Sequence, residues 1–288
     1  MKPLRAFRML PAPMFLAPLL LPIVASAFCG LQSCPRPASH GEMSTLEAGL
    51  RTRWVAYDIA GNEGSYLVTA PRLFVRYWGV ALGAEIPFTR LQAGTETTSG
   101  LSNPILMAQY ARRFSATWSG EVGMQVELPV GDEKDGLAGD HLMLLPWVGA
   151  RKDLGTRWYV SGMLGASRAI ETKHEDEDVA SLAKVAHEGH EHGESATATP
   201  VIVNPHADRE IQWRAATGWT RGRSTLEGFT LAQHDVTGEA GPDFYLRAGA
   251  SWEWAIGNMS ALQLIGDLPV TAARRNEAEI GLALRTGW

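Results

Sequence analysis

The stretch WSGEVGMQVELPV, residues 118–130, alternates apolar and polar side chains along most of its length. One face carries Trp118, Gly120, Val122, Met124, Val126, Leu128 and Val130, and the other carries Ser119, Glu121, Gly123, Gln125 and Glu127. A period of two residues predicts a β-strand, because successive side chains of a strand point to opposite faces. The stretch therefore predicts a long strand with one apolar and one polar face.

The same alternation recurs in most of the chain beyond Met43. We count about twelve such strands, an even number within the range of bacterial outer-membrane barrels. They are expected at residues 43–57, 65–77, 79–90, 102–113, 116–130, 140–153, 156–170, 209–221, 224–235, 243–256, 259–268 and 277–288.

The links between these strands alternate between short and long. Tight turns are expected near 78–79, 114–115, 154–155, 222–223 and 257–258, and longer links at 58–64, 91–101, 131–139, 171–208, 236–242 and 269–276. Short periplasmic turns and longer outer loops are typical of an outer-membrane barrel with both termini on the periplasmic side. The predicted fold class is all-β, a transmembrane antiparallel up-and-down β-barrel of about 12 strands.

A soluble sandwich or lipocalin-like barrel is the alternative, but many of the strands are long enough to cross a bilayer at a tilt. Aromatic residues near strand ends, at 77–78, 158–159, 252 and 254, suggest interfacial girdles. The polar faces also carry charges in strand after strand, which suit a polar lumen. The predicted lumen-lining residues are Glu47, Arg51, Arg72, Arg76, Glu85, Glu121, Glu127, Arg214, Glu227, Arg247, Glu253, Glu279 and Arg285.

The first 27 residues have the layout of a secretory signal peptide: a basic start, an apolar run and the small residues Ala25-Ser26-Ala27. Four prolines in the apolar run argue against a membrane-spanning helix. We expect cleavage after Ala27, a periplasmic segment at 28–42 and a barrel at 43–288. The cleaved segment holds three basic residues and no acid, so the net charge would change from −5 to −8, which disfavours nucleic-acid binding.

The only two cysteines, Cys29 and Cys34, lie close together in the predicted periplasmic segment. In an oxidising compartment such a pair favours a disulfide. A pair of thiolate metal ligands is the alternative, although a zinc site would need a second pair that the chain lacks.

The longest predicted outer loop, 171–208, is rich in histidine and acid and holds the run HEGHEHGE at 187–194. Imidazole with nearby carboxylates suits Zn(II), Cu(II) or Ni(II), so loose metal binding is expected here, and a solvated acidic loop is the alternative. The candidate ligands are His174, His187, Glu188, His190, Glu191, His192, Glu194 and His206.

The last strand, EIGLALRTGW, ends on the aromatic Trp288 with alternating apolar residues before it. This pattern resembles the C-terminal signal that the outer-membrane barrel-assembly machinery reads. The expected partners are therefore that machinery and outer-membrane lipid.

Several apolar-Pro motifs at strand ends, at 85–88, 127–132 and 267–270, together with LSNPILMAQYARRF at 101–114, resemble a family of exported barrels. These are the outer-membrane transporters grouped with the MetA pathway of phenol degradation. The resemblance covers residues 43–288, but the His-rich loop and the cysteine pair depart from it.

The leading functional hypothesis is a barrel that passes, or helps to pass, a small solute or metal ion without covalent chemistry and without a required cofactor. A closed barrel that captures divalent metal with its outer loop is the alternative. A lipid hydrolase built on His141 or His234 is a lesser one, because no motif identifies a nucleophile.

Overall fold

The computed structural model describes residues 44–59, 62–132, 136–139, 141–170, 209–237, 244–257, 260–271 and 278–287. No helix among these residues is long and apolar enough to cross a membrane. The strands are β1 (Ser44–Ile59), β2 (Asn62–Tyr77), β3 (Val80–Glu85), β4 (Phe88–Ala93), β5 (Glu96–Leu101), β6 (Ile105–Arg113), β7 (Trp118–Glu127), β8 (Leu142–Leu154), β9 (Trp158–Ile170), β10 (Arg209–Arg221), β11 (Ser224–Asp235), β12 (Phe244–Ile256), β13 (Ser260–Pro269) and β14 (Ala278–Gly287).

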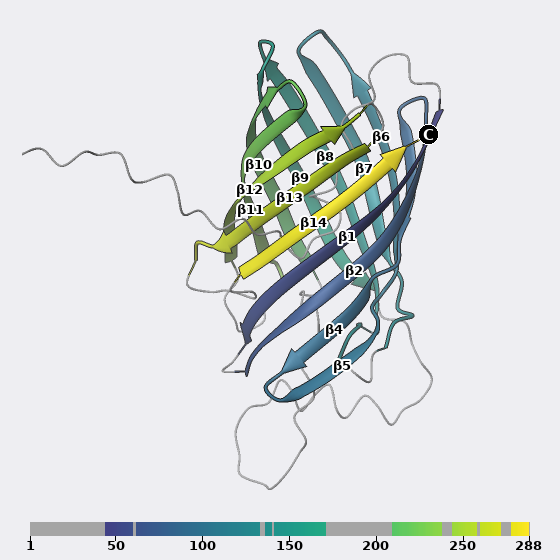
Figure 1. Cartoon of the computed structure of the whole chain (residues 1–288), viewed down its shortest axis with the longest axis vertical. Helices are drawn as coiled ribbons and strands as arrows, with labels where there is room; N and C mark the ends of the chain where they lie inside the picture. Colours follow the sequence, from purple (N-terminus) through teal and green to yellow (C-terminus); the bar gives the residue numbers. More distant parts are fainter. Residues whose placement is uncertain are drawn as a thin grey trace, which may run out of the picture.

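The strands form one closed antiparallel barrel, which confirms the predicted fold class (Figure 1). From β6 to β14 each strand pairs with the next in sequence, β3 pairs with β2 and β6, and β14 pairs with β1 to close the ring. The ring has twelve strands although fourteen are labelled. β3 and β4 are two parts of one barrel strand, and β5 and β6 are two parts of the next.

Two of the twelve strands are interrupted by proline. The strand β2 pairs with β3 along one half of its length and with β4 along the other, and Ile86-Pro87 separates the two partners. The neighbouring strand is broken at 102–104, where Pro104 precedes β6. Proline has no N–H to donate to a ladder, which accounts for the breaks at Pro87 and Pro104. Pro71 inside β2 still stands in register with Leu50.

Two of the predicted outer links are wrong, because strands run into them. The register of β1 and β2 extends to Ile59 and Asn62, so the predicted link at 58–64 belongs mostly to that hairpin. Residues 88–93 pair with 96–101 around a turn at Gly94, where the link 91–101 was expected. The polar run GTETTSG resembles a loop in composition, yet it holds three threonines, a β-branched residue that favours strands.

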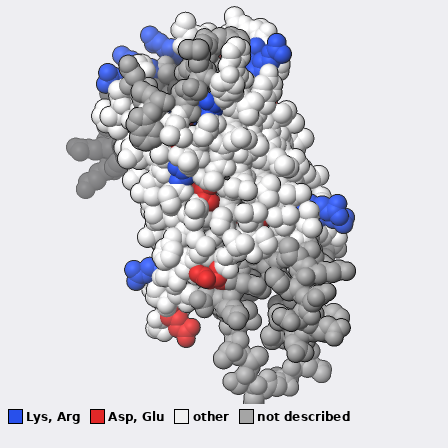
Figure 2. Space-filling view, turned by 90° about the vertical axis from the view of Figure 1, so that its right-hand side faces the viewer, with Lys and Arg blue, Asp and Glu red and all other residues white. Residues whose placement is uncertain are grey.

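The outer surface of the barrel is apolar. Large side chains such as Leu50, Leu82, Val122, Leu164 and Leu282 are about half exposed. Figure 2 shows a face that is mostly uncharged, with a few scattered charged side chains and with lysine and arginine gathered towards its upper end. An apolar surface of this extent suits contact with lipid rather than water.

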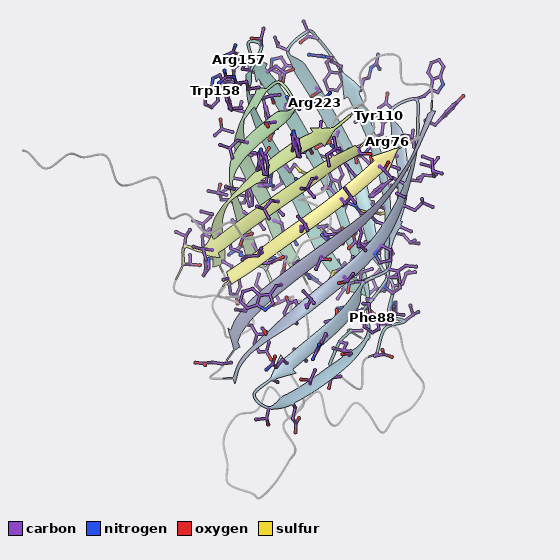
Figure 3. The ribbon with its side chains drawn as sticks, viewed as in Figure 1. Arg76, Phe88, Tyr110, Arg157, Trp158 and Arg223 are labelled. Carbon is purple, nitrogen blue, oxygen red and sulfur yellow. The ribbon has the colours of Figure 1, made fainter. Side chains whose placement is uncertain are left out.

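The aromatic residues predicted to form girdles gather at the end of the barrel where the tight turns lie. Trp158 and the basic residues Arg157 and Arg223 lie near that end, whereas Phe88 lies in the other half (Figure 3). Tyr159 differs from the prediction. It is buried and points inward, because neighbouring residues of a strand point to opposite faces.

Candidate functional site: the charged lumen

The thirteen predicted lumen residues all lie on the inward face of the barrel. Each is buried or half-buried and shares a strand face with other buried residues, while the exposed apolar side chains occupy the opposite face. These inward positions come from β1, β2, β3, β7, β10, β11, β12 and β14. The alternation of each strand thus places charges from distant parts of the chain around one lumen.

A chain of ion pairs runs along the inner wall and links four neighbouring strands. Arg53 of β1 lies 3.3 Å from Glu279 of β14, which also accepts a hydrogen bond of 3.4 Å from Arg247 of β12. Arg247 pairs in turn with Asp267 of β13. Arg53 and Asp267 were not in the predicted set, although both stand on the polar faces of their strands.

The same chain of charges continues in the other direction from β1. Arg51 pairs with Glu85 of β3, reaching across β2. Glu85, like Asp267 and Glu279, has a fully buried side chain. Buried carboxylates remain ionised only where such partners offset the loss of water, so these pairs hold the side chains in fixed positions.

A second tier of pairs lies nearer the tight-turn end. Arg76 donates to Glu47 at 3.1 Å, and Arg285 donates to Glu253 at 2.9 Å. Figure 3 shows Arg76 close to that end of the barrel. These pairs are half-buried and closer to water than those at mid-height, so each stabilises the fold less.

On the wall formed by β8 to β11, charge and aromatic rings alternate. Glu227 accepts hydrogen bonds from Arg214 and, at 2.7 Å, from the Tyr159 hydroxyl. The Arg151 guanidinium lies 3.6 Å from the centre of the Tyr159 ring, and Arg214 lies 4.7 Å from that of Phe229. Cation–π contacts of this kind orient the guanidinium groups as the carboxylates do.

The inward face was predicted to be polar, but parts of it are apolar. Buried clusters of apolar side chains line parts of it: Val55, Tyr57, Tyr66, Val68, Ala70, Leu91 and Leu137 in one, Trp147, Met163 and Leu231 in another, and Ala216, Phe229 and Ile265 in a third. In such segments both faces of the strand are apolar, so the alternation that marks an inward residue disappears. Only the register with neighbouring strands identifies them.

Part of the connection between β7 and β8, predicted as an outer link, folds against the inner wall. Leu137 is almost fully buried in the apolar cluster of β1, β2 and β4. Asn103 holds the connection on both sides: its side chain donates to the Gly139 carbonyl at 2.9 Å and accepts from the Gly131 N–H at 3.1 Å. Asp132 accepts from the Leu101 N–H at 2.6 Å. This segment therefore narrows the lumen.

The other predicted sites are not brought together in the described part of the chain. The cysteine pair and all eight candidate metal ligands of the 171–208 loop lie outside the described residues, as do the signal segment and Trp288. Within the described ranges, no group of three or more His, Cys, Asp or Glu side chains is placed to hold a metal ion.

The two histidines considered for a hydrolase site lie in different environments. His234 is exposed on the outward face of β11, beside the Phe244 ring at 6.5 Å. His141 precedes β8 and lies near Glu127, on the side of the barrel that carries the long connections. An outward position at the rim does not favour a role for His234 in a shared active site.

Comparison with known proteins finds the fold but no sequence family. No family model matches the chain, and no curated protein matches it. An outer membrane channel from Pseudomonas putida F1 is similar in structure, with a TM-score of 0.67 at 12% identity over 87% of this chain and 100% of that one. The KdgM porin in complex with disordered oligogalacturonate reaches 0.48 at 8% identity, over 84% and 98% of the two chains. The similarity to the channel shows that this chain has the fold of a bacterial outer-membrane barrel.

Proposed function

We propose that this chain is a passive channel for small solutes in the bacterial outer membrane. The observation that supports it most is the distribution of polarity: a closed ring of strands with apolar residues outside and paired charges inside. Such a ring satisfies its backbone hydrogen bonds between strands, as a lipid environment requires. In the proposed orientation the short turns face the periplasm and the long connections face outward.

The lumen favours a narrow path. Barrels of about eight strands are filled by side chains and those of about sixteen are open, so twelve strands leave limited space. Arginine side chains reach over neighbouring strands at mid-height, and Leu137 occupies part of the wall. We therefore expect small solutes to pass and large ones to be excluded.

A small organic solute fits this lumen better than a metal ion does. A metal ion would need free carboxylates along its path, but Glu85, Glu227 and Glu279 are each bound by arginine. Aromatic and aliphatic side chains beside these pairs offer contact for carbon skeletons. The proposal is thus a channel for small organic molecules.

Conductance in a planar bilayer tests this proposal. Protein refolded in detergent and shown to be folded by a heat-dependent shift in electrophoretic mobility should give small, discrete current steps in potassium chloride. Liposomes containing it should swell in small sugars or amino acids faster than in larger oligosaccharides. Folded protein that gives neither current nor swelling would contradict the channel function.

A further inference from the structure

Arg72, on the inward face of β2, carries a charge that no acid in the described part of the chain neutralises directly. Its side chain is buried, with the residue 8% exposed. No ion pair joins it to a described carboxylate, and its Nε atom has no hydrogen-bond partner. A buried charge without a partner is costly, and such a group in a native structure calls for a ligand or an ion.

The neighbouring arginines differ from Arg72 in this respect. Each of the other inward-facing arginines in the described ranges has a carboxylate within salt-bridge distance: Arg51, Arg53, Arg76, Arg113, Arg151, Arg214, Arg247 and Arg285. Arg72 is therefore the exception among the inward-facing arginines of the described residues.

The acids closest to Arg72 are already bound elsewhere. Glu85 lies directly opposite Arg72 in the β2–β3 ladder, but its carboxylate pairs with Arg51. Glu47 also acts on Arg72 electrostatically, but it accepts from Arg76. Arg72 thus adds a net positive charge to this part of the wall.

The surroundings of Arg72 hold its side chain without neutralising it. Gly49 lies opposite it on β1, and a Cβ atom there would stand 3.1 Å from Arg72 Nε, so the glycine leaves room for the guanidinium. Phe74, two residues along the same face, has its ring centre 5.9 Å from the guanidinium carbon. An apolar ring beside a cation suits a ligand that has both an anionic group and a carbon chain.

We propose that Arg72 binds the carboxylate of a small organic anion as it passes through the lumen. The guanidinium group offers two parallel N–H donors that match the two oxygens of a carboxylate. Rings of arginine or lysine make pores selective for anions, and Arg72 gives its own stretch of the wall a position that favours an anionic group. This inference rests on the proposed channel function for its biological setting.

Equilibrium binding of butyrate tests the site separately from transport. Sodium butyrate is titrated calorimetrically into the refolded full-length protein in detergent, with butyramide as the uncharged analogue. We expect butyrate to bind and butyramide not to bind. In Arg72→Gln the affinity should fall about tenfold or more, because a charged hydrogen-bonded pair is lost. Arg72→Lys should be intermediate, since it keeps the charge without the planar fork.

The matched control is the double variant Arg214→Gln with Glu227→Gln, which removes an ion pair on β10 and β11 without changing the net charge. It should bind butyrate as the wild type does. Each variant must show the heat-dependent mobility shift of the folded barrel. If the wild type does not bind butyrate, or if Arg72→Gln binds it equally well, the site is refuted.

Bilayer recordings separate this failure from failure of the channel. The reversal potential in a potassium chloride gradient should move towards cation preference in Arg72→Gln, and butyrate should reduce the wild-type current more than the variant current. Current without Arg72-dependent butyrate binding would refute the site and leave the channel. Butyrate binding that depends on Arg72, in folded protein without current, would leave the site and refute the channel.

Discussion

At the scale of single residues, the lumen combines buried charges with glycines that make room for large side chains. A Cβ atom at Gly218 would overlap the Tyr159 ring, and one at Gly83 would overlap the ring of Phe74. The rings thus lie against the wall and leave the centre to the charged groups. One of the fully buried charges is the carboxylate of Glu279, which two arginines approach.

Replacing Glu279 by glutamine should destabilise the barrel by about 3 kcal/mol, because it removes the charge of a fully buried partner of Arg53 and Arg247. Urea unfolding in lipid or detergent, followed by tryptophan fluorescence, measures the change. The variant Glu253→Gln is the control. Its pair with Arg285 is partly exposed, so the loss should be about 1 kcal/mol or less. Equal losses in the two variants would contradict the importance of burial.

At the scale of strands and connections, the sequence predicts the number of barrel strands and the direction of the charged side chains, because both depend on a period of two residues. The predicted link 91–101 is different. Its composition suggests a loop, but it holds the end of β4 and the whole of β5, which pair with each other. The position of Leu137 could not be predicted either. It depends on contacts with β1, β2 and β4, which are distant in the chain.

The connection between β7 and β8 should depend on Asn103. The substitution Asn103→Ala removes the bonds to Gly139, Gly131 and Glu127, so the segment should detach from the wall. We expect larger or noisier single-channel currents and faster proteolysis within 131–139. Ser99→Ala, at an exposed position of β5, is the control and should leave both unchanged. Unaltered current and proteolysis in Asn103→Ala would show that the segment is held by other contacts.

At the scale of the whole molecule, the ring of hydrogen-bonded strands does not depend on the longest connection. β9 and β10 pair directly along their length, starting at Arg168 and Arg209. The predicted metal ligands lie within 171–208 and the lumen charges lie on the strands, so the two features occupy separate parts of the chain. Each can therefore be altered without the other.

Replacing residues 171–208 by a short turn of asparagine and glycine should leave the mobility shift and the conductance unchanged, because the β9–β10 ladder remains. If the histidines of this segment bind Zn(II), as the sequence leads us to expect, binding measured by calorimetry should be present in the full chain and lost in the shortened one. Loss of the folded band would show that the segment is needed for the barrel. Equal zinc binding by both proteins would place the ligands elsewhere.

The pairing of β14 with β1 has a consequence for how the molecule forms. Glu47 and Gly287 are register partners although they stand about 240 residues apart in the chain. Contacts of such long range form slowly, since most of the chain must be ordered before they gain anything. Until that seam is made, the two end strands present unpaired backbone edges, and the apolar outer face has no lipid around it. The unassembled chain is thus prone to aggregation until the seam between β14 and β1 closes.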